Sequence, residues 1–382
     1  MYLFFVTIFS IYGGMHLYAF LRARAALDFG TGTGAALAFF MLIMTFAPFI
    51  VRASERQGLE ILARVMSYTG YIWMGMLFIF VVSAFTFDIF RLLVLVAESV
   101  LNKDLTHMKP STSFLFFVPL IMSVLISTYG YFEAVNIKLE KVTIKTSKIP
   151  EDIGRLRIAQ ISDVHIGLIV RENRLKRVLE RVKAAEPDIL VSTGDLVDGQ
   201  LDNLLDISEM FMEIDPKYGK YAITGNHEFY AGLDHALGFI EQAGFTVLRN
   251  KGVTVQDLIN IVGVDDPTGK RFGLSRGMTE KELLSRQPSE KFTLLLKHRP
   301  FVDKDSIGLF DLQLSGHTHK GQIFPFSLIT KMYYPKQAGL LRLQENASLY
   351  VSRGSGTWGP PIRFLAPPEV TLIELVYDKN AR

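Results

Sequence analysis

The sequence has no cysteine and little net charge, and each shortage excludes a class of protein. Without cysteine, the chain can form neither disulfide bonds nor thiolate metal sites. The 41 Lys and Arg residues nearly balance the 38 Asp and Glu residues, so the formal net charge is only +3. This weak charge argues against nucleic acid as a partner, because long polyanions are usually bound by strongly basic surfaces.

Charged residues are scarcest in the first third of the chain, where residues 1–135 hold 15 of the 79 charged side chains. Four apolar stretches in this part approach the roughly 20 residues that a helix needs to cross a bilayer. They are 1–21, 34–51, 68–87 and 113–132. Basic residues stand at or near their ends, as interface anchors would: Arg22, Arg52, Arg91 and Lys109. The sequence therefore predicts a four-helix transmembrane region over 1–135 and a multi-pass protein of the cell membrane.

Four crossings would place the N-terminus and the residues after 135 on the same side of the membrane. The second loop and the start of the tail hold seven basic residues, and the other two loops hold five. Because cytoplasmic segments are enriched in Lys and Arg, this difference favours a cytoplasmic C-terminal domain. Within the membrane region, Asp88 and Arg91 are three residues apart and are expected to form an ion pair.

From residue 139 onward the pattern changes to short β-rich runs that alternate with helices. The apolar run 156–161 has the length of a buried strand, 172–185 is an amphipathic helix, and 189–192 is the next strand. Strand, helix and strand at this spacing predict a parallel βαβ unit. A hairpin is predicted within 253–262, so the sheet should be mixed. The fold class is α/β, with a second domain over 139–382.

Side chains that can bind metal follow five of the predicted strands. They are Asp163 with His165, Asp195, Asn226 with His227, His298, and His317 with His319. Ligands of α/β folds gather beyond the carboxyl ends of strands, so these donors should converge on one rim. Residues i and i+2 of an extended segment point the same way, which lets Asp163 and His165 reach one ion together. The donor set predicts a metal cluster; buried core histidines and helix caps are the alternative interpretation.

In order and spacing, these blocks resemble the calcineurin-like metallophosphoesterases, whose pattern is D-x-H, G-D, G-N-H-[DE], H and G-H-x-H. The resemblance covers about residues 139–376. Runs near 263–266, 316–322 and 352–354 are similar to a branch of membrane-associated or exported members. The resemblance implies a four-layer α/β/β/α sandwich of two mixed sheets, with two metals between loops at one edge.

The resemblance also implies a role for each donor. The first metal would be held by Asp163, His165 and His319. The second metal would be held by Asn226, His298 and His317. Asp195 would bridge both ions, and His227, beside the metals, would be the acid that protonates the leaving group. Two divalent ions of Mn, Fe, Zn or Co suit these nitrogen and oxygen donors, and Asp198 and Glu228 would orient ligating histidines.

Together these features predict a membrane-anchored phosphoesterase. It would hydrolyse a phosphate ester or pyrophosphate through hydroxide activated by two metals, and its partners would be the lipid bilayer and a phosphorylated small molecule or lipid-linked substrate. Serine/threonine phosphatases carry arginine in GDxxDRG, where this chain has Gly199, which disfavours protein substrates. Two alternatives are a phosphodiesterase for a soluble nucleotide and a non-enzymatic scaffold with a structural metal site. His227 disfavours the scaffold, because a structural site needs no acid.

An apolar, aromatic stretch over 324–334 follows the last block. Core packing is its ordinary interpretation. The alternative is an interfacial or lipid-tail groove, because aromatic side chains are enriched at membrane–water boundaries. Arg353, with Gly354 and Gly356, could cradle a phosphate or simply form a turn.

Overall fold

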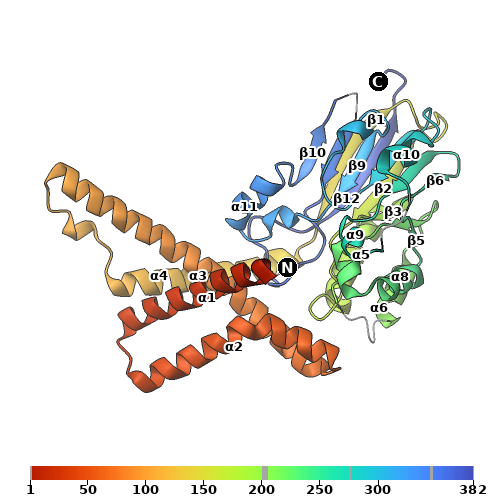
Figure 1. Ribbon diagram of the computed structural model, residues 1–382. Coiled ribbons are helices and arrows are strands. Elements are labelled where there is room, and N and C mark those ends of the chain that lie inside the picture. The colour runs from red at the N-terminus through yellow and green to blue at the C-terminus, as the bar shows by residue number, and fades with distance from the viewer. Residues whose placement is uncertain (1, 200–204, 275–276, 345–346, 382) are drawn as a thin grey trace. The chain divides into compact units, whose positions relative to one another are not determined.

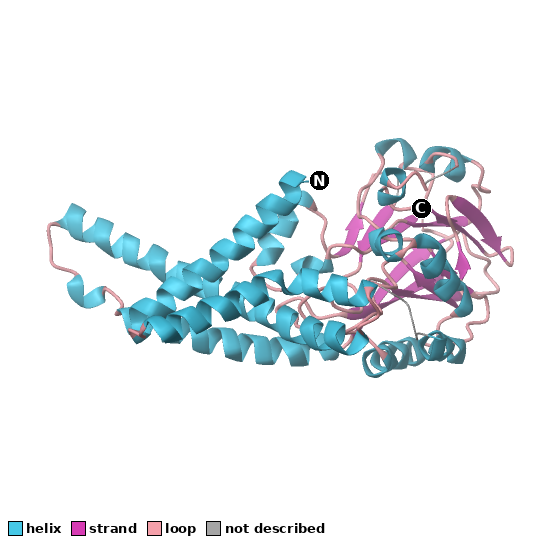
Figure 2. Ribbon diagram, turned by 60° about the horizontal axis from the view of Figure 1, so that its bottom comes forward, coloured by secondary structure: helices cyan, strands magenta, loops and turns pink. Residues whose placement is uncertain are grey.

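The computed structural model describes residues 2–199, 205–274, 277–344 and 347–381 (Figure 1). The chain divides into two compact units. The helical unit comprises Met1–Phe132 with Gly359–Ile362, and the sheet unit comprises Glu133–Trp358 with Arg363–Arg382. Strands occur in the sheet unit, whereas the helical unit is built from long helices (Figure 2).

Long helices cover all four predicted spans. They are α1 (Tyr2–Leu27), α2 (Thr31–Arg56), α3 (Glu60–Leu101) and α4 (Thr112–Val135), with a short 3-10 helix, η1 (Thr106–Met108), before α4. Among the described residues, three segments are long and apolar enough to cross a membrane: Thr31–Arg56, Glu60–Leu101 and Thr106–Val135. The first predicted span lies in α1, begins outside the described residues and is not among the three. Within the part of the chain that the structure describes, the predicted four candidate spans are therefore corrected to three.

Helix α3 extends well beyond the third predicted span. Helix α3 has 42 residues, which at the rise of an α-helix is about 60 Å, roughly twice the thickness of a hydrocarbon core. The flanking residues that were expected to be loops continue the helix because nothing in 60–101 breaks it: the segment contains no proline. The predicted Asp88–Arg91 pair is wrong. Asp88 instead pairs with Arg22 and accepts a hydrogen bond from the Tyr18 hydroxyl at 2.6 Å.

The sheet unit contains two six-stranded sheets. The first has the order β1 (Lys138–Thr146), β12 (Glu369–Tyr377), β2 (Arg155–Ile161), β3 (Ile189–Ser192), β4 (Lys220–Ala222), β5 (Thr246–Val247). The second has the order β10 (Gly339–Arg342), β11 (Ser348–Val351), β9 (Leu312–Ser315), β8 (Phe292–Leu296), β7 (Ile259–Gly263), β6 (Lys251–Val255). Both are mixed: β12 is antiparallel to β2, and the pairs β6–β7 and β10–β11 are antiparallel. The predicted mixed α/β class is confirmed.

Seven α-helices are described in the sheet unit besides the last turn of α4. They are α5 (Glu172–Ala185), α6 (Leu205–Met210), α7 (Asn226–Ala231), α8 (Leu233–Gln242), α9 (Thr268–Arg271), α10 (Glu280–Ser285) and α11 (Phe326–Tyr333). Three 3-10 turns accompany them: η2 (Phe211–Glu213), η3 (Lys304–Ser306) and η4 (His319–Gly321). The predicted βαβ unit is confirmed as β2–α5–β3, whose strands are parallel, and the predicted hairpin is β6–β7.

Alternating strand residues divide between different hydrophobic clusters. In β2, Ala159 belongs to a cluster shared with α5 and α8, whereas Ile158 packs into a cluster that contains residues of both sheets. In the second sheet, Ile261 joins that same shared cluster, and Val262 joins another with Leu283 of α10. The period of two in the side chains thus buries apolar residues on both faces of each sheet, and the predicted metal-binding side chains follow the strand ends.

Candidate metal centre

The predicted donors lie at one edge of the two sheets because the strands that they follow are parallel to one another within each sheet. Strands β2, β3 and β4 are parallel in the first sheet, as are β7, β8 and β9 in the second. Their carboxyl ends therefore face the same way. Three groups of His and Asp side chains there bring one ligand atom each within 4.8 Å of one another.

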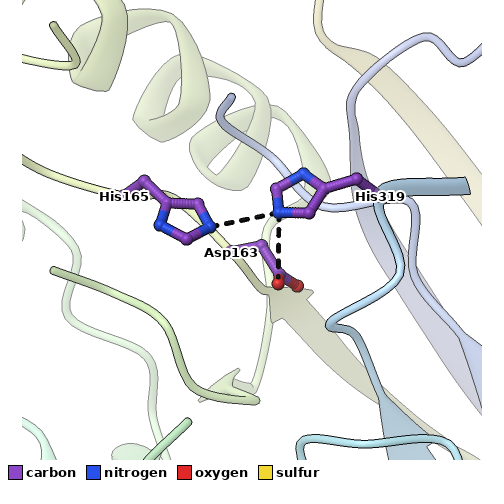
Figure 3. A group of neighbouring side chains, drawn as sticks. All are labelled: Asp163, His165 and His319. Atoms are coloured by element: carbon purple, nitrogen blue, oxygen red, sulfur yellow. Dashed lines mark hydrogen bonds and ion pairs between the residues drawn. The ribbon is translucent and has the colours of Figure 1, made fainter. Parts of the chain in front are cut away.

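The first group consists of Asp163, His165 and His319, all buried (Figure 3). The Nε2 atoms of His165 and His319 are 3.1 Å apart, and His319 Nε2 is 3.5 Å from Asp163 Oδ1. Two nitrogens that bind the same ion, each at about 2.0–2.1 Å, lie roughly 3.0–3.4 Å from each other. The spacing is therefore that of ligands that share an ion.

The second group consists of Asp195, His298 and His317. His298 Nε2 lies 3.1 Å from Asp195 Oδ2 and 3.1 Å from His317 Nδ1. Asp195 Oδ2 also lies 4.0 Å from His165 Nε2 of the first group. Asp195 therefore stands between the two groups.

Asn226 supplies a further oxygen at this edge. Its backbone begins α7, and its side chain is buried. No described residue provides a hydrogen bond to its Oδ1 atom. A buried amide oxygen without a partner is costly, and a metal ion would satisfy it. The residues present thus fit the nitrogen and oxygen donor set that the sequence predicts.

Most of the predicted ligands have left-handed backbone conformations. The φ angles are 51° at Asp163, 55° at His165, 51° at Asp195, 70° at His317 and 46° at His319. Non-glycine residues rarely adopt positive φ, and such conformations persist only where the surrounding structure imposes them. Backbone strain is therefore concentrated where these side chains converge.

Gly225 lets two of the blocks approach closely. A Cβ atom at this position would lie 2.2 Å from Asp195 Oδ1 and 2.7 Å from the Asp195 backbone nitrogen. The backbone N–H of His227 donates to the same Oδ1 atom at 2.8 Å. Only glycine leaves room for the Asp195 carboxylate to lie against the start of α7.

The third group consists of His165, Asp195 and His227, so His227 lies beside the first two groups. His227 also contacts a second acid. Its Nδ1 atom is 2.6 Å from Asp198 Oδ1. Burial alone would lower the pKa of His227, but the Asp195 and Asp198 carboxylates raise it to about 9. Asp198 is also 3.4 Å from His165 Nδ1, so it contacts one predicted ligand and the predicted acid, as expected of a group that orients histidines.

The other acidic neighbour, Glu228, has a different function from the one expected. It contacts no histidine through the bonds described. Its carboxylate instead accepts the backbone N–H groups of Asp195 at 3.0 Å, Leu196 at 2.7 Å and Gly225 at 2.6 Å. Glu228 therefore fixes the backbone of two of the blocks against each other.

Two histidines of these groups, His317 and His319, are kept neutral, as metal ligands must be. His298 differs: burial alone would lower its pKa, but the Asp195 carboxylate raises it to about 10. Burial and the adjacent His298 lower the pKa of His317 to about 3. Burial, followed by the nearby Arg363 guanidinium, holds the pKa of His319 well below its ordinary value. Although burial alone would raise the pKa of Asp195, His298 and His227 hold it well below the usual range.

Arg363 was not predicted from the sequence. It is fully buried, and its Nη2 atom lies 3.0 Å from His319 Nδ1. Four backbone carbonyls accept its other N–H groups: those of Arg353, Gly354, Gly356 and Ala366. Its position in the sequence, 44 residues after His319, gives no sign of this contact. Arg353, a candidate phosphate ligand, pairs instead with Glu140 and Glu369 at 2.6 Å.

Comparisons with known proteins agree with this arrangement. The sequence model of the calcineurin-like phosphoesterases matches residues 156–321. An uncharacterised metallophosphoesterase of Aquifex aeolicus is 40% identical over 260 residues, which are 67% of this chain and 98% of the relative. A transmembrane protein with a metallophosphoesterase domain from Danio rerio is 32% identical, over 67% of this chain and 61% of the relative. An uncharacterised metallophosphoesterase of Helicobacter pylori is 32% identical, over 66% of this chain and 68% of the relative.

The matched segment contains every strand-end block, from Asp163 to His319. The Aquifex aeolicus relative is matched over nearly its whole length. The chain therefore belongs to the calcineurin-like phosphoesterase family.

Proposed function

We propose that this protein is a membrane-anchored phosphoesterase that hydrolyses a phosphate ester or pyrophosphate of a lipid-linked or membrane-derived substrate with two divalent metal ions. The observation that carries the proposal is the position of Asp195. Its Oδ2 atom lies 3.1 Å from His298 of one donor group and 4.0 Å from His165 of the other. One carboxylate between two donor groups is the arrangement of a bridging ligand.

Each ion would have its own set of protein donors. Asp163, His165 and His319 would hold the first ion with Asp195. Asn226, His298 and His317 would hold the second ion with Asp195. When bound, the two ions would acidify a water and neutralise charge on the phosphoryl oxygens. Mn, Fe, Zn and Co all suit these donors.

His227 would donate a proton to the leaving oxygen. Its Nδ1 atom is 2.6 Å from Asp198 Oδ1, and this contact orients the imidazole ring. Nε2 is then the atom that would donate the proton to the leaving oxygen. The ring lies edge-on to His165 at a centroid distance of 4.6 Å, and to Trp358 at 6.1 Å. His227 is thus next to the donor groups, where a general acid must be.

The proposal also includes the limits of the two domains. We assign the phosphoesterase domain to 139–382 and the transmembrane region to 1–135. The three hydrophobic clusters of the sheet unit support a four-layer α/β/β/α arrangement. The basic residues that directly follow α4, Lys138, Lys141 and Lys145 among them, support a cytoplasmic location for the sheet unit.

The experiment uses the full chain in detergent or nanodiscs, stripped of metal by a chelator and then supplied with Mn²⁺. We expect metal-dependent hydrolysis of bis(p-nitrophenyl) phosphate. A panel of phosphomonoesters, cyclic nucleotides and lipid pyrophosphates then ranks the substrates. Retention of metal without turnover on the whole panel would contradict the proposal and identify a structural metal site instead.

A further inference from the structure

An exposed apolar helix follows directly after the last two histidines of the metal centre. Helix α11 contains no buried residue. The large apolar side chains in and beside it are exposed: Phe324, Phe326, Leu328, Ile329, Met332 and Tyr333. Met332 is 80% exposed and Tyr333 is 73% exposed. The core-packing interpretation of this stretch is therefore wrong, because core side chains would be covered.

The same segment carries charge of one sign. From 320 to 343 the sequence has four basic residues and no acidic one. Lys331 lies within α11, and Lys331 and Arg342 are exposed. An exposed apolar and aromatic helix that carries a Lys and is flanked by further basic residues is typical of segments that lie in the interface of an anionic membrane.

The segment is also fixed rigidly to the metal centre. The Tyr334 hydroxyl is 3.0 Å from His317 Nε2, and Thr318 Oγ1 donates to the Gln337 carbonyl at 2.7 Å. At Gly321, in the turn that contains His319, a Cβ atom would lie 2.3 Å from Ser327 Cα of α11. Such close backbone packing leaves no room for α11 to move independently of the ligands that precede it.

We propose that the surface formed by 324–333 docks on an anionic lipid bilayer and presents a membrane-held phosphoester to the metal centre. Charge selects this occupant, since the segment 320–343, which contains this surface, has four basic residues and no acidic one and so complements anionic headgroups. The candidate span Thr106–Val135 would also tie the sheet unit to a bilayer, because only Asn136 and Ile137 separate it in sequence from β1. The docking itself stands independently of activity; the presentation of substrate rests on the proposed function.

The docking is tested in the full chain reconstituted in nanodiscs with anionic lipid. The absence of cysteine makes single labelling straightforward. Met332→Cys carries an environment-sensitive fluorophore, and Lys281→Cys, on an exposed position of α10, is the matched control. We expect lipids with a quencher at headgroup depth to quench the label at 332 and not at 281, and neutral lipid to weaken the effect. Equal quenching at both positions overturns the proposal, as does quenching that appears only with two protein copies per disc.

The presentation of substrate is tested with two substrates in parallel. Met332→Glu should lower hydrolysis of a vesicle-held phosphoester about tenfold, since the helix would lose part of its apolar insertion. Hydrolysis of soluble bis(p-nitrophenyl) phosphate should be unchanged. Equal loss on both substrates, or on neither, contradicts this part. If the parent protein hydrolyses neither substrate, the proposed function fails, while the quenching experiment still decides the docking.

Discussion

Buried histidines have different partners in the two units. In the helical unit, buried His16 has both ring nitrogens satisfied: Nδ1 faces the Tyr12 carbonyl at 2.8 Å, and Nε2 accepts from Trp73 Nε1 at 2.9 Å. In the sheet unit, His165 and His319 turn ring nitrogens toward each other and toward a carboxylate. Burial of a polar residue is therefore no sign of function by itself. Convergence of several lone pairs on one point is such a sign.

Backbone conformations differ in the same way. In the helical unit, positive φ at non-glycine residues occurs at Asp28 and Asn102, which lie just beyond helix ends. There it ends a helix, a common and inexpensive use. In the sheet unit, five predicted ligands share this conformation. The second unit holds its donors in conformations that a free chain would avoid, which the core on both sheet faces makes possible.

The largest difference between the two units is expected when one carboxylate is removed from each. Asp195→Ala should remove the link between the donor groups and lower kcat/KM by at least about 10³-fold, because bound metal supplies several kcal/mol to the transition state and each 1.36 kcal/mol is tenfold. Metal content, measured by mass spectrometry, should fall as well. Asp88→Asn, which removes the partner of Arg22, should leave metal content unchanged. Equal metal loss in both variants would contradict the comparison.

The second test compares His227 with His16, neither of which is a predicted metal ligand. His227→Asn should slow hydrolysis of an alkyl phosphoester by about 10²–10⁴-fold, the range for loss of a general acid. The loss should be much smaller with p-nitrophenolate, a leaving group that needs no protonation, and metal content should be retained. His16→Asn should lower the thermal midpoint without any dependence on the leaving group. A uniform loss for both leaving groups in His227→Asn would show that His227 is not the acid.

The third test compares two glycines. Gly225→Ala would put a methyl group 2.2 Å from Asp195 Oδ1, so the carboxylate or the start of α7 must shift, and overpacking of this kind costs about 1–3 kcal/mol. We expect weaker metal binding in a titration followed by calorimetry. At Gly14, nothing described lies within 4 Å of an added Cβ, and Gly14→Ala should bind metal like the parent protein. Normal metal affinity in Gly225→Ala would refute the packing argument.

The smallest expected effect is at Glu133, in the last turn of α4. Its carboxylate accepts the backbone N–H groups of Ala366 at 2.8 Å and Leu365 at 3.3 Å. Glu133→Gln keeps one acceptor oxygen and loses the charge, so the free energy of unfolding should fall by about 1 kcal/mol. Turnover should stay close to that of the parent protein. A large loss of turnover would show that the Arg363–His319 contact depends on this helix end, because the Arg363 guanidinium also donates to the Ala366 carbonyl.

Sequence reasoning was reliable where the signal is local and failed where it depends on distant partners. The βαβ unit and the hairpin were predicted because periodicity and turn residues report directly on neighbours in sequence. The ends of α3 were not predicted, because a hydropathy run marks the part of a helix that lipid can cover and not where the helix ends. Asp88 was paired with the nearest arginine, whereas its partner, Arg22, lies 66 residues away.

By itself, the sequence determined that the first region has the composition of a membrane segment and that the second has the pattern of a metal-binding α/β domain. It also identified the candidate metal-binding side chains, from Asp163 to His319. Those inferences depend on composition and on the side-chain period of strands, which are properties of short segments. Only the tertiary structure decided that Asp195 lies between the two donor groups, that Arg363 reaches His319, and that α11 is exposed next to them. Each of these is a contact between residues far apart in the chain, and the packing of the two sheets sets their distances.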